Sequence, residues 1–392
     1  MNRSILFLTG IFIIACQEVS ESPRQISEVQ SVAFRLTPFE DDDPLSKTTY
    51  EATSNGYVFY WAEGDAVGIV SPEGSQLKFP ILPEFYGQQY ADFDGRGFLL
   101  QANTRYASYY PFIPDFDLNP SAVPVSYIGQ QSVGDNDVSH LGDYSFSVAK
   151  GNSPAAGKLE FVFLNVGSPH RYRLPAISGD YTSLSLKIGN NKFVLRGTVD
   201  LLSETDSELI MINPSELSDT MSLDLQGTSL NAPGPLRCWM MMPPVNLDGE
   251  VIGLTLTLAD GSEIVASVAG KDCPANSRRV FNAFTSIYPA ESSVGSDGGE
   301  VQVKLIRTAE TDAVTLSVDN DWLSQTSSST EGLVTVYTFT VAANSGAERE
   351  GSISFTETST GLTNTVKVIQ QKAGTVIGIG GWDSDSYSGK AN

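Results

Sequence analysis

Short runs in which apolar and polar residues alternate occur along most of this chain, and each run is closed by a turn signal. The stretch "EVIGLTLTLADGSEIVASV", residues 250–268, holds two such runs around Asp260-Gly261, a pair that tolerates positive φ and favours a hairpin. The stretch "SLSLKIGNNKFVLRGTVDL" predicts strand, turn and strand, and "KLEFVFLNV" at Lys158–Val166 alternates with strand period. A long 3.6-residue amphipathic repeat occurs in no window, so the sequence predicts an all-β fold of tandem β-sandwiches.

Two changes of pattern divide the chain of 392 residues, a length typical of two to four domains. A Ser/Gly-rich turn region after Pro289 is followed by a fresh alternating strand, and residues 289–373 are enough for a seven-stranded sandwich. A second boundary is expected after the strand that ends at Val166. We therefore expect sandwiches at 31–166, 167–288 and 289–373, followed by a Gly-rich tail at 374–392.

The first residues resemble an export signal. Arg3 precedes a largely apolar stretch, Ile5–Ala15, which is too short to span a bilayer and suits a signal-peptide core. The stretch ends in "IIAC", which resembles a bacterial lipobox, so residues 1–15 would be removed and Cys16 would carry the lipid. The alternative is a plain secretory signal with a chance cysteine. Residues 16–30 are polar and unpatterned, as in a tether.

The charge of the chain restricts its partners. A formal net charge of −22 argues against a nucleic-acid partner and against electrostatic docking on anionic lipid, since both need clustered Lys and Arg. Membrane contact is therefore expected through the lipid alone. The dense acidic run "FEDDDP", residues 39–44, is typical of a solvated loop.

Motifs for chemistry are incomplete. The chain has no Gly-x-Ser-x-Gly elbow and no phosphate loop, because Gly64 and Gly68 have neither the spacing nor the following Lys. The run "DNDVSHLGD" begins like a calcium loop but has His140 where the turn demands Gly. We therefore expect no enzyme, no metal site and no cofactor.

Two cysteines remain after Cys16, namely Cys238 and Cys273. An even remainder in an exported chain permits a disulfide, which would stabilise the fold by roughly 3–4 kcal/mol on the chain-entropy account. Neither of the two histidines lies near a cysteine in the sequence, so the spacing does not favour zinc.

Aromatic residues are the candidate ligand contacts. Tyr106, Tyr109 and Tyr110 gather in "TRYASYYPFIP", and Trp322 follows a strand and a turn. Such side chains stack on sugars and form contacts with proteins when they are exposed. The alternative, which the pattern favours, is that they fill or close sandwich cores.

The order of these features resembles the fimbrillin-like proteins of Bacteroidetes over residues 30–288. Their pattern has a Trp-x-x-Gly-Asp strand pair, an aromatic strand, and later a "LxFxF"-type strand; "WMMMPPVNLDGEVIGLTLTLADGSEIVASV" resembles their C-terminal hairpin. The matching residues are Trp61, Gly64, Asp65, Gly68, Tyr109, Pro111, Asp143, Ala149, Phe161 and Phe163.

The last module resembles a BACON domain, a small immunoglobulin-like sandwich of secreted Bacteroidetes proteins. The similarity lies in "SVDNDWLS", "FTVAANSGAEREGSISFTE" and "TNTVKVIQQ". The matching residues are Trp322, Asn344, Arg349, Gly351, Ile353 and Gln370.

These resemblances imply two transthyretin-like sandwiches and one immunoglobulin-like sandwich. They imply a lipid-anchored outer-membrane or cell-surface protein that partners other fimbrial subunits by donor-strand exchange, after processing at Arg24 or Arg35. The appended module suggests an accessory or tip-type subunit acting in adhesion. The alternative is a surface lipoprotein that captures host or dietary glycans through Tyr106, Tyr109, Tyr110 or Trp322.

Overall fold

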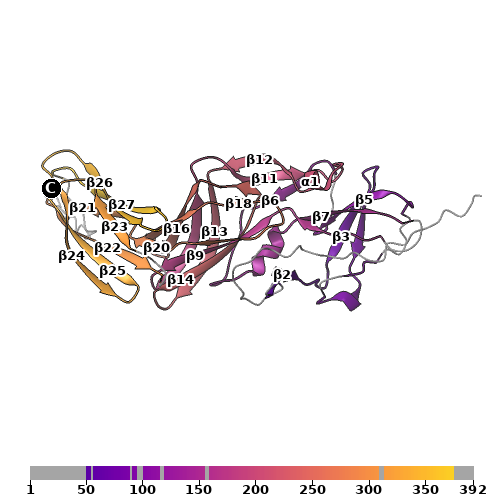
Figure 1. Ribbon diagram of the computed structural model, residues 1–392, viewed down its shortest axis with the longest axis horizontal. Helices are drawn as coiled ribbons and strands as arrows, with labels where there is room; N and C mark the ends of the chain where they lie inside the picture. Colours follow the sequence, from indigo (N-terminus) through magenta and orange to yellow (C-terminus); the bar gives the residue numbers. More distant parts are fainter. Residues whose placement is uncertain are drawn as a thin grey trace, which may run out of the picture.

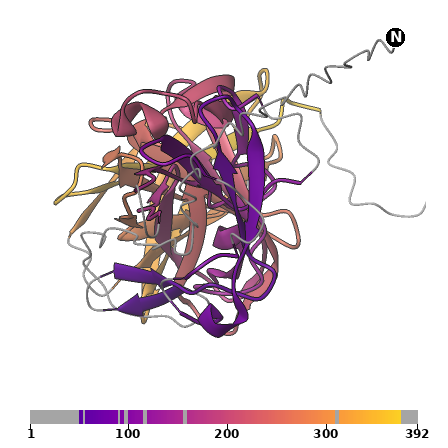
Figure 2. The same cartoon turned by 90° about the vertical axis from the view of Figure 1, so that its right-hand side faces the viewer.

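A computed structural model describes residues 50–53, 56–88, 91–94, 100–114, 119–154, 159–308 and 313–374. The regular structure of these residues is almost all strand; their helical pieces are the 3-10 helices η1 (Pro83–Phe85) and η2 (Ser139–Tyr144) and one turn of α-helix, α1 (Asp206–Leu209). The prediction of an all-β tandem of sandwiches is confirmed. The bodies follow each other in chain order along the molecule (Figure 1), and they overlap when it is viewed from the N-terminal end (Figure 2).

The first sandwich is built on a five-stranded sheet of order β4-β3-β5-β7-β8. Its core holds Trp61, Phe79, Phe93, Phe161 and Phe163, all at most 1% exposed. Its strands are β3 (Ala66–Val70), β4 (Gln76–Pro80), β5 (Arg105–Tyr110), β7 (Ser147–Asn152) and β8 (Leu164–Asn165), and a separate hairpin comprises β1 (Tyr50–Thr53) and β2 (Gly56–Phe59).

The predicted strand at residues 158–166 is only partly formed. Leu159, Phe161 and Phe163 are buried while Val162 is 58% exposed, so the alternation correctly indicates which side chains face the core. The named strand is limited to Leu164–Asn165, however, which pairs with β7. This extended segment is thus held in place more by the burial of its apolar side chains than by hydrogen bonds to a neighbouring strand.

The expected boundary after Val166 does not separate the first two bodies cleanly. Strand β6 (Val123–Ser126) pairs antiparallel with β11 (Phe193–Val199), with Val123 opposite Val199. The main chain of Gln130 and Ser132 also exchanges hydrogen bonds with Asp224. The chain therefore crosses into the second body at residues 119–145 and returns through β7, so one apolar core includes residues of both parts.

The second sandwich packs a long sheet against two shorter ones. The Asp260-Gly261 hairpin is confirmed: it joins β16 and β17, Gly261 has φ +82°, and Asp260 Oδ1 accepts from the Ser262 amide. The strands are β9 (Ser168–Ala176), β10 (Gly179–Lys187), β11, β12 (Ile212–Ser218), β13 (Thr220–Leu230), β14 (Gly234–Met242), β15 (Val245–Asn246), β16 (Val251–Leu258), β17 (Glu263–Ala269), β18 (Asp272–Cys273) and β19 (Arg279–Asn282).

The third sandwich contains seven strands in its described residues, as its length predicts. One of them, a polar strand of nine residues, lies at the edge of its sheet. The strands are β21 (Glu291–Val294), β22 (Gly299–Arg307), β23 (Val314–Val318), β24 (Leu323–Glu331), β25 (Val334–Val341), β26 (Arg349–Glu357) and β27 (Thr363–Gln370).

One strand ties the second and third sandwiches together. β20 (Thr285–Tyr288) lies between β17 and β22, which gives an eight-stranded sheet of order β13-β10-β16-β17-β20-β22-β25-β24. Within β20, buried Thr285 donates through Oγ1 to Glu357 Oε1 at 2.6 Å, and Ser286 donates to the Pro175 carbonyl at 2.6 Å. The two bodies therefore share a sheet and a buried polar joint.

Candidate functional site

The tyrosine cluster lies mainly inside the molecule. Tyr106 is 3% exposed and Tyr109 is fully buried, on opposite sides of β5, because this strand lies between the first core and the second. Burial raises the pKa of the Tyr109 hydroxyl to about 12. Tyr110 is half-buried and donates to Asp65 Oδ1 at 2.8 Å. These rings are therefore structural contacts rather than an exposed stacking platform.

The Trp-x-x-Gly-Asp turn is part of the same packing. Trp61 contacts Tyr110 edge-on with ring centroids 5.0 Å apart, and Asp65 Oδ2 accepts from the Ala62 amide at 2.7 Å. Burial raises the pKa of the Asp65 carboxyl, although both hydrogen bonds oppose that shift. Gly68 is required because a Cβ there would lie 2.1 Å from Cε1 of Tyr109.

Trp322 closes one end of the third sandwich. Its ring is half-buried against Gly351, and the Arg349 guanidinium lies 4.4 Å from the ring centroid. Arg349 Nε donates to Gln370 Oε1 at 2.8 Å, and Gln370 Nε2 donates to the Ala342 carbonyl at 2.9 Å. The residues that carry the resemblance to the BACON domain thus form a structural network.

The expected disulfide is not present. Cys238 and Cys273 are both buried free thiols. Both lie in the central core: Cys238 is on β14, and Cys273 is on the short strand β18, where its Sγ donates to the Lys271 carbonyl at 3.2 Å. Burial raises the pKa of both thiols, that of Cys273 to about 12, so neither resembles a reactive cysteine.

The calcium-like loop uses its carboxylates internally. Asp135 forms an ion pair with Arg237, and Asp137 accepts from the amides of Val133 and Ser139. His140 Nε2 donates to the Trp239 carbonyl, 3.0 Å away. Among the described residues, no group of three or more His, Cys, Asp or Glu is placed to hold a metal ion.

One buried cluster has the composition of a catalytic site but no access for a substrate. His170 Nε2 lies 3.1 Å from Ser168 Oγ, and Nδ1 lies 3.2 Å from the Tyr172 hydroxyl. All three side chains are fully buried, and burial lowers the pKa of His170 to about 3. These three hydrogen-bonded side chains of β9 are part of the core. The spacing of residues in the sequence did not predict this cluster.

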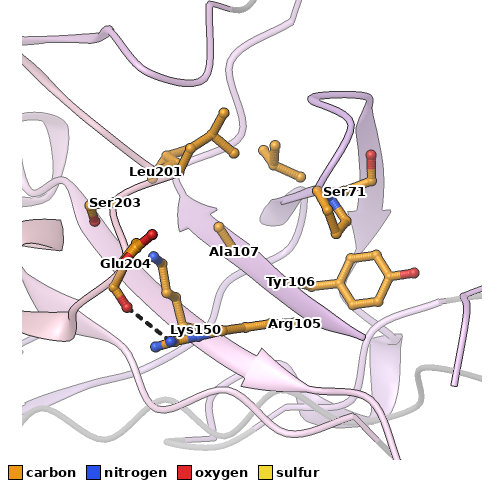
Figure 3. Close-up of a pocket in the computed structure, with 11 residues that line it drawn as sticks. Ser71, Arg105, Tyr106, Ala107, Lys150, Leu201, Ser203 and Glu204 are labelled. Carbon is orange, nitrogen blue, oxygen red and sulfur yellow. Dashed lines mark hydrogen bonds between the residues drawn. The ribbon is translucent and has the colours of Figure 1, made fainter. Parts of the chain in front are cut away.

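A hollow of about 460 Å³ opens where the first and second sandwiches meet (Figure 3). Arg105 on β5 and Lys150 on β7 point into it from one side, because they share the sheet face of Ala107 at its solvent end. Glu204 and Ser203 face them from the second sandwich, and Arg105 Nη1 donates to the Glu204 carbonyl at 2.9 Å.

Both walls of this hollow are fixed by local hydrogen bonds. On one side, the turn after β3 is closed by Ser71, whose Oγ accepts from the Ser75 amide. On the other side, Leu201 is buried and its amide donates to the Pro120 carbonyl, while Asp200 Oδ1 accepts from the Leu202 amide. The site is therefore preformed by two sandwiches rather than by one loop.

A second hollow, of about 720 Å³, lies at the next junction. Ile177 and Pro233 of the second sandwich contribute to it, and so do Leu333 and Val336 of the third. Lys304 and Glu331 are its charged lining residues. A hollow is therefore present at each of the two junctions between consecutive sandwiches.

The two edges of the eight-stranded sheet differ. At one edge, β13 is partly covered at Asp224 by the main chain of Gln130 and Ser132. At the other edge, β24 pairs within the described part of the chain with β25 alone, and eight of its nine residues are exposed. Strand β24 carries Ser, Thr and Gln with a single charge, Glu331, so it lacks the Lys and Pro that usually protect an edge.

Four expected sites lie outside the residues that the structure describes. They are the lipidation site Cys16, the processing candidates Arg24 and Arg35, and the tail beyond Gly374. In the described part of the chain, none of the helices has the length and apolar composition needed to cross a membrane.

Comparison with known proteins gives distant structural similarity alone. No protein-family model matches the chain, and no curated protein matches it. Similar solved structures include a candidate cell adhesion protein from Bacteroides eggerthii, at 9% identity and TM-score 0.29, with 67% of this chain and 86% of that chain covered. The extracellular portion of mouse CD200RLa is similar at 10% identity and TM-score 0.15, with 52% and 96% covered. An endo-fucoidan hydrolase of glycoside hydrolase family 107 is similar at 9% identity and TM-score 0.18, with 79% and 39% covered. Similarity at these TM-scores assigns neither a family nor a function.

Proposed function

We propose that this chain is a non-catalytic adhesion protein of the bacterial cell surface, an accessory or tip-type fimbrial subunit anchored through a lipid on Cys16. The observation that carries the proposal is the end-to-end joining of the sandwiches by a shared core and a shared sheet. Such an arrangement suits a stiff spacer that holds a surface away from the cell. The resemblance to fimbrillin-like proteins supports the same role.

Assembly with other subunits is proposed to use strand addition. An exposed edge strand presents unpaired amides and carbonyls, which a strand from another subunit satisfies. Strand β24, nine residues long and at one end of the molecule (Figure 1), presents such groups on the side that faces away from β25. Its exposed hydroxyl side chains add no charge that would repel a second strand.

The test compares cells that display three forms of the full chain, the wild type and two variants, with cells that lack the chain. We expect Ser328→Lys, at the centre of β24, to weaken assembly into high-molecular-weight species and adherence of the cells to host-cell layers, because a lysine on an edge disfavours strand addition. Gln302→Lys is the matched control: it adds the same charge at an exposed position of β22, an inner strand of the same sheet. Adherence that does not depend on the presence of the chain contradicts the adhesion role; equal assembly of both variants contradicts strand addition at β24.

Glycan capture through the tyrosine cluster or Trp322 has less support. Tyr106 and Tyr109 are buried, and Trp322 is covered by Arg349. Ligand contacts are therefore better sought where the sandwiches meet.

A further inference from the structure

Strand β24 combines an open edge with a nearly uncharged surface. Within the described part of the chain it pairs with β25 alone, and all of its residues except Leu323 are exposed. The register between the two strands shifts between Gln325 and Ser327, so Thr326 is an extra residue and the regular part of the edge is Ser327–Glu331. Every second residue of an antiparallel strand directs its amide and carbonyl away from the neighbour with which it pairs. This regular part can therefore accept one further strand.

The sequence of this edge is complementary to itself in the antiparallel direction. A two-fold axis at Ser329 places Ser328 opposite Thr330 of a second copy, and Ser327 opposite Glu331 of that copy. Pairs of serine and threonine across antiparallel strands are favourable, and a serine hydroxyl can donate to a carboxylate. The two Glu331 carboxylates lie at opposite ends of the paired segment, so the pairing sets no like charges against each other.

The direction of β24 decides how two paired molecules would lie. Its last residue, Glu331, lines the hollow at the second junction together with Ile177 of the second sandwich. The strand therefore runs from the free end of the molecule toward the second sandwich, and the first sandwich lies at the opposite end (Figure 1). Because antiparallel strands run in opposite directions, two copies paired at β24 would extend to opposite sides. Chains anchored at Cys16 on two facing surfaces would meet in this orientation.

We propose that β24 pairs antiparallel with β24 of a second copy of this chain, about a two-fold axis at Ser329, and thereby joins two cells. The inference deepens the proposed function and rests on it, because it names the partner of the edge strand in adhesion. A single contact of this kind is small. Many copies on each surface act together, however, so weak single contacts suffice to hold two cells.

Cysteine cross-linking tests the axis in the purified full chain, with Cys16 replaced by Ser. In Ser329→Cys the two new thiols lie on the axis, where opposed Cα atoms are about 4.5–5.5 Å apart, within the range of a disulfide. In Ser327→Cys, the control on the same exposed strand, the Cα atoms are about 14 Å apart, because a strand rises about 3.4 Å per residue. We expect mild oxidation to form covalent dimer at least about tenfold faster in Ser329→Cys than in Ser327→Cys. Adding Glu331→Cys to Ser327→Cys should restore the cross-link, because these two positions face each other.

Cells that display the chain test the role of this pairing. We expect such cells to aggregate with one another, and we expect Ser329→Glu to lose this aggregation, because it sets two carboxylates against each other on the axis. Gln302→Glu is the matched control: it adds the same charge at an exposed position of β22, an inner strand of the same sheet, and should aggregate as the wild type does. Circular dichroism of the purified variants checks that both fold.

Equal cross-linking of the two single-cysteine variants, or a protein that stays monomeric, overturns the inference, whether the edge then takes another subunit or residues 375–392 of its own chain. Equal aggregation of Ser329→Glu and Gln302→Glu does the same. Adherence to host-cell layers separates this result from the proposed function. Adherent cells whose protein forms no cross-link through Ser329→Cys leave the adhesion role standing. A cross-linked dimer of a protein that confers no adherence contradicts the adhesion role and leaves the pairing standing.

Discussion

At the scale of single residues, His170 makes the stability of the protein depend on pH. Burial lowers its pKa from 6.5 to about 3, so the folded state binds a proton less readily than the unfolded chain. Stability is therefore complete above pH 6.5 and is lost as the pH falls from there toward 3. Between pH 6.5 and pH 5 the loss is about 2 kcal/mol, because each pH unit contributes about 1.4 kcal/mol.

The measurement is urea denaturation at pH 7.5 and at pH 5, with the unfolding free energy compared between the wild type and His170→Gln. The variant should be less stable at pH 7.5, since Gln cannot reproduce both contacts, to Ser168 and Tyr172. It should, however, lose about 2 kcal/mol less than the wild type on acidification. The same acid-induced loss in both proteins would assign the pH dependence to other groups.

The sequence indicated which residues form a motif more often than it indicated which side chains meet in the folded protein. The strand-pair motif of Trp61, Gly64, Asp65 and Gly68 was identified in the sequence, and its Trp61 side chain packs into the first core. The hollow was not foreseen, because Arg105, Lys150 and Glu204 are separated by up to 99 positions and meet only through the contact of two sandwiches. Spacing along one strand carries no information about such a meeting.

At the scale of elements, alternation predicted strands well and their partners poorly. The runs on both sides of Gly189 are strands β10 and β11, as expected, yet they belong to different sheets. β6 pairs with β11 across the expected boundary, and its Val123 and Val125 side chains are buried there. Which strand a run pairs with depends on burial against residues that are distant in the sequence. Short alternating runs resemble one another, so their pattern does not specify the pairing.

Strand β20 joins the second and third sandwiches, and the contribution of its polar contacts to stability can be measured. Thr285→Val keeps the side-chain shape but removes the hydroxyl that donates to Glu357, which is 2% exposed. We expect the unfolding free energy to fall by about 1–3 kcal/mol, the usual effect of leaving a buried acceptor short of a donor. Thr340→Val, the same change at an exposed position of β25, should have little effect. Equal effects of the two changes on the denaturation midpoint would show that the joint contributes nothing.

At the scale of the whole molecule, the sandwiches form a stiff rod rather than beads on a flexible string. Residues from both sides of the first junction share one apolar core, and the sheet that contains β17, β20 and β22 passes through the second. Neither junction depends on a long linker, so relative motion of the bodies would require breaking packed side chains or ladder hydrogen bonds. A rod is what allows a ligand site or an edge strand to be held at a fixed distance from an anchor.

Distance measurements between spin labels test this rigidity. Labels at Glu73→Cys and Lys187→Cys span the first junction, and labels at Lys187→Cys and Ser328→Cys span the second; all three positions are exposed. Cys16 is replaced by Ser for this experiment, and Cys238 and Cys273 do not interfere because they are buried and their pKa values are raised. We expect one narrow distance distribution for each pair, and Thr285→Val should broaden the second pair alone because it weakens only that joint. Broad distributions in the wild type would mean that the sandwiches move independently, and the proposed spacer role would then lose its physical basis.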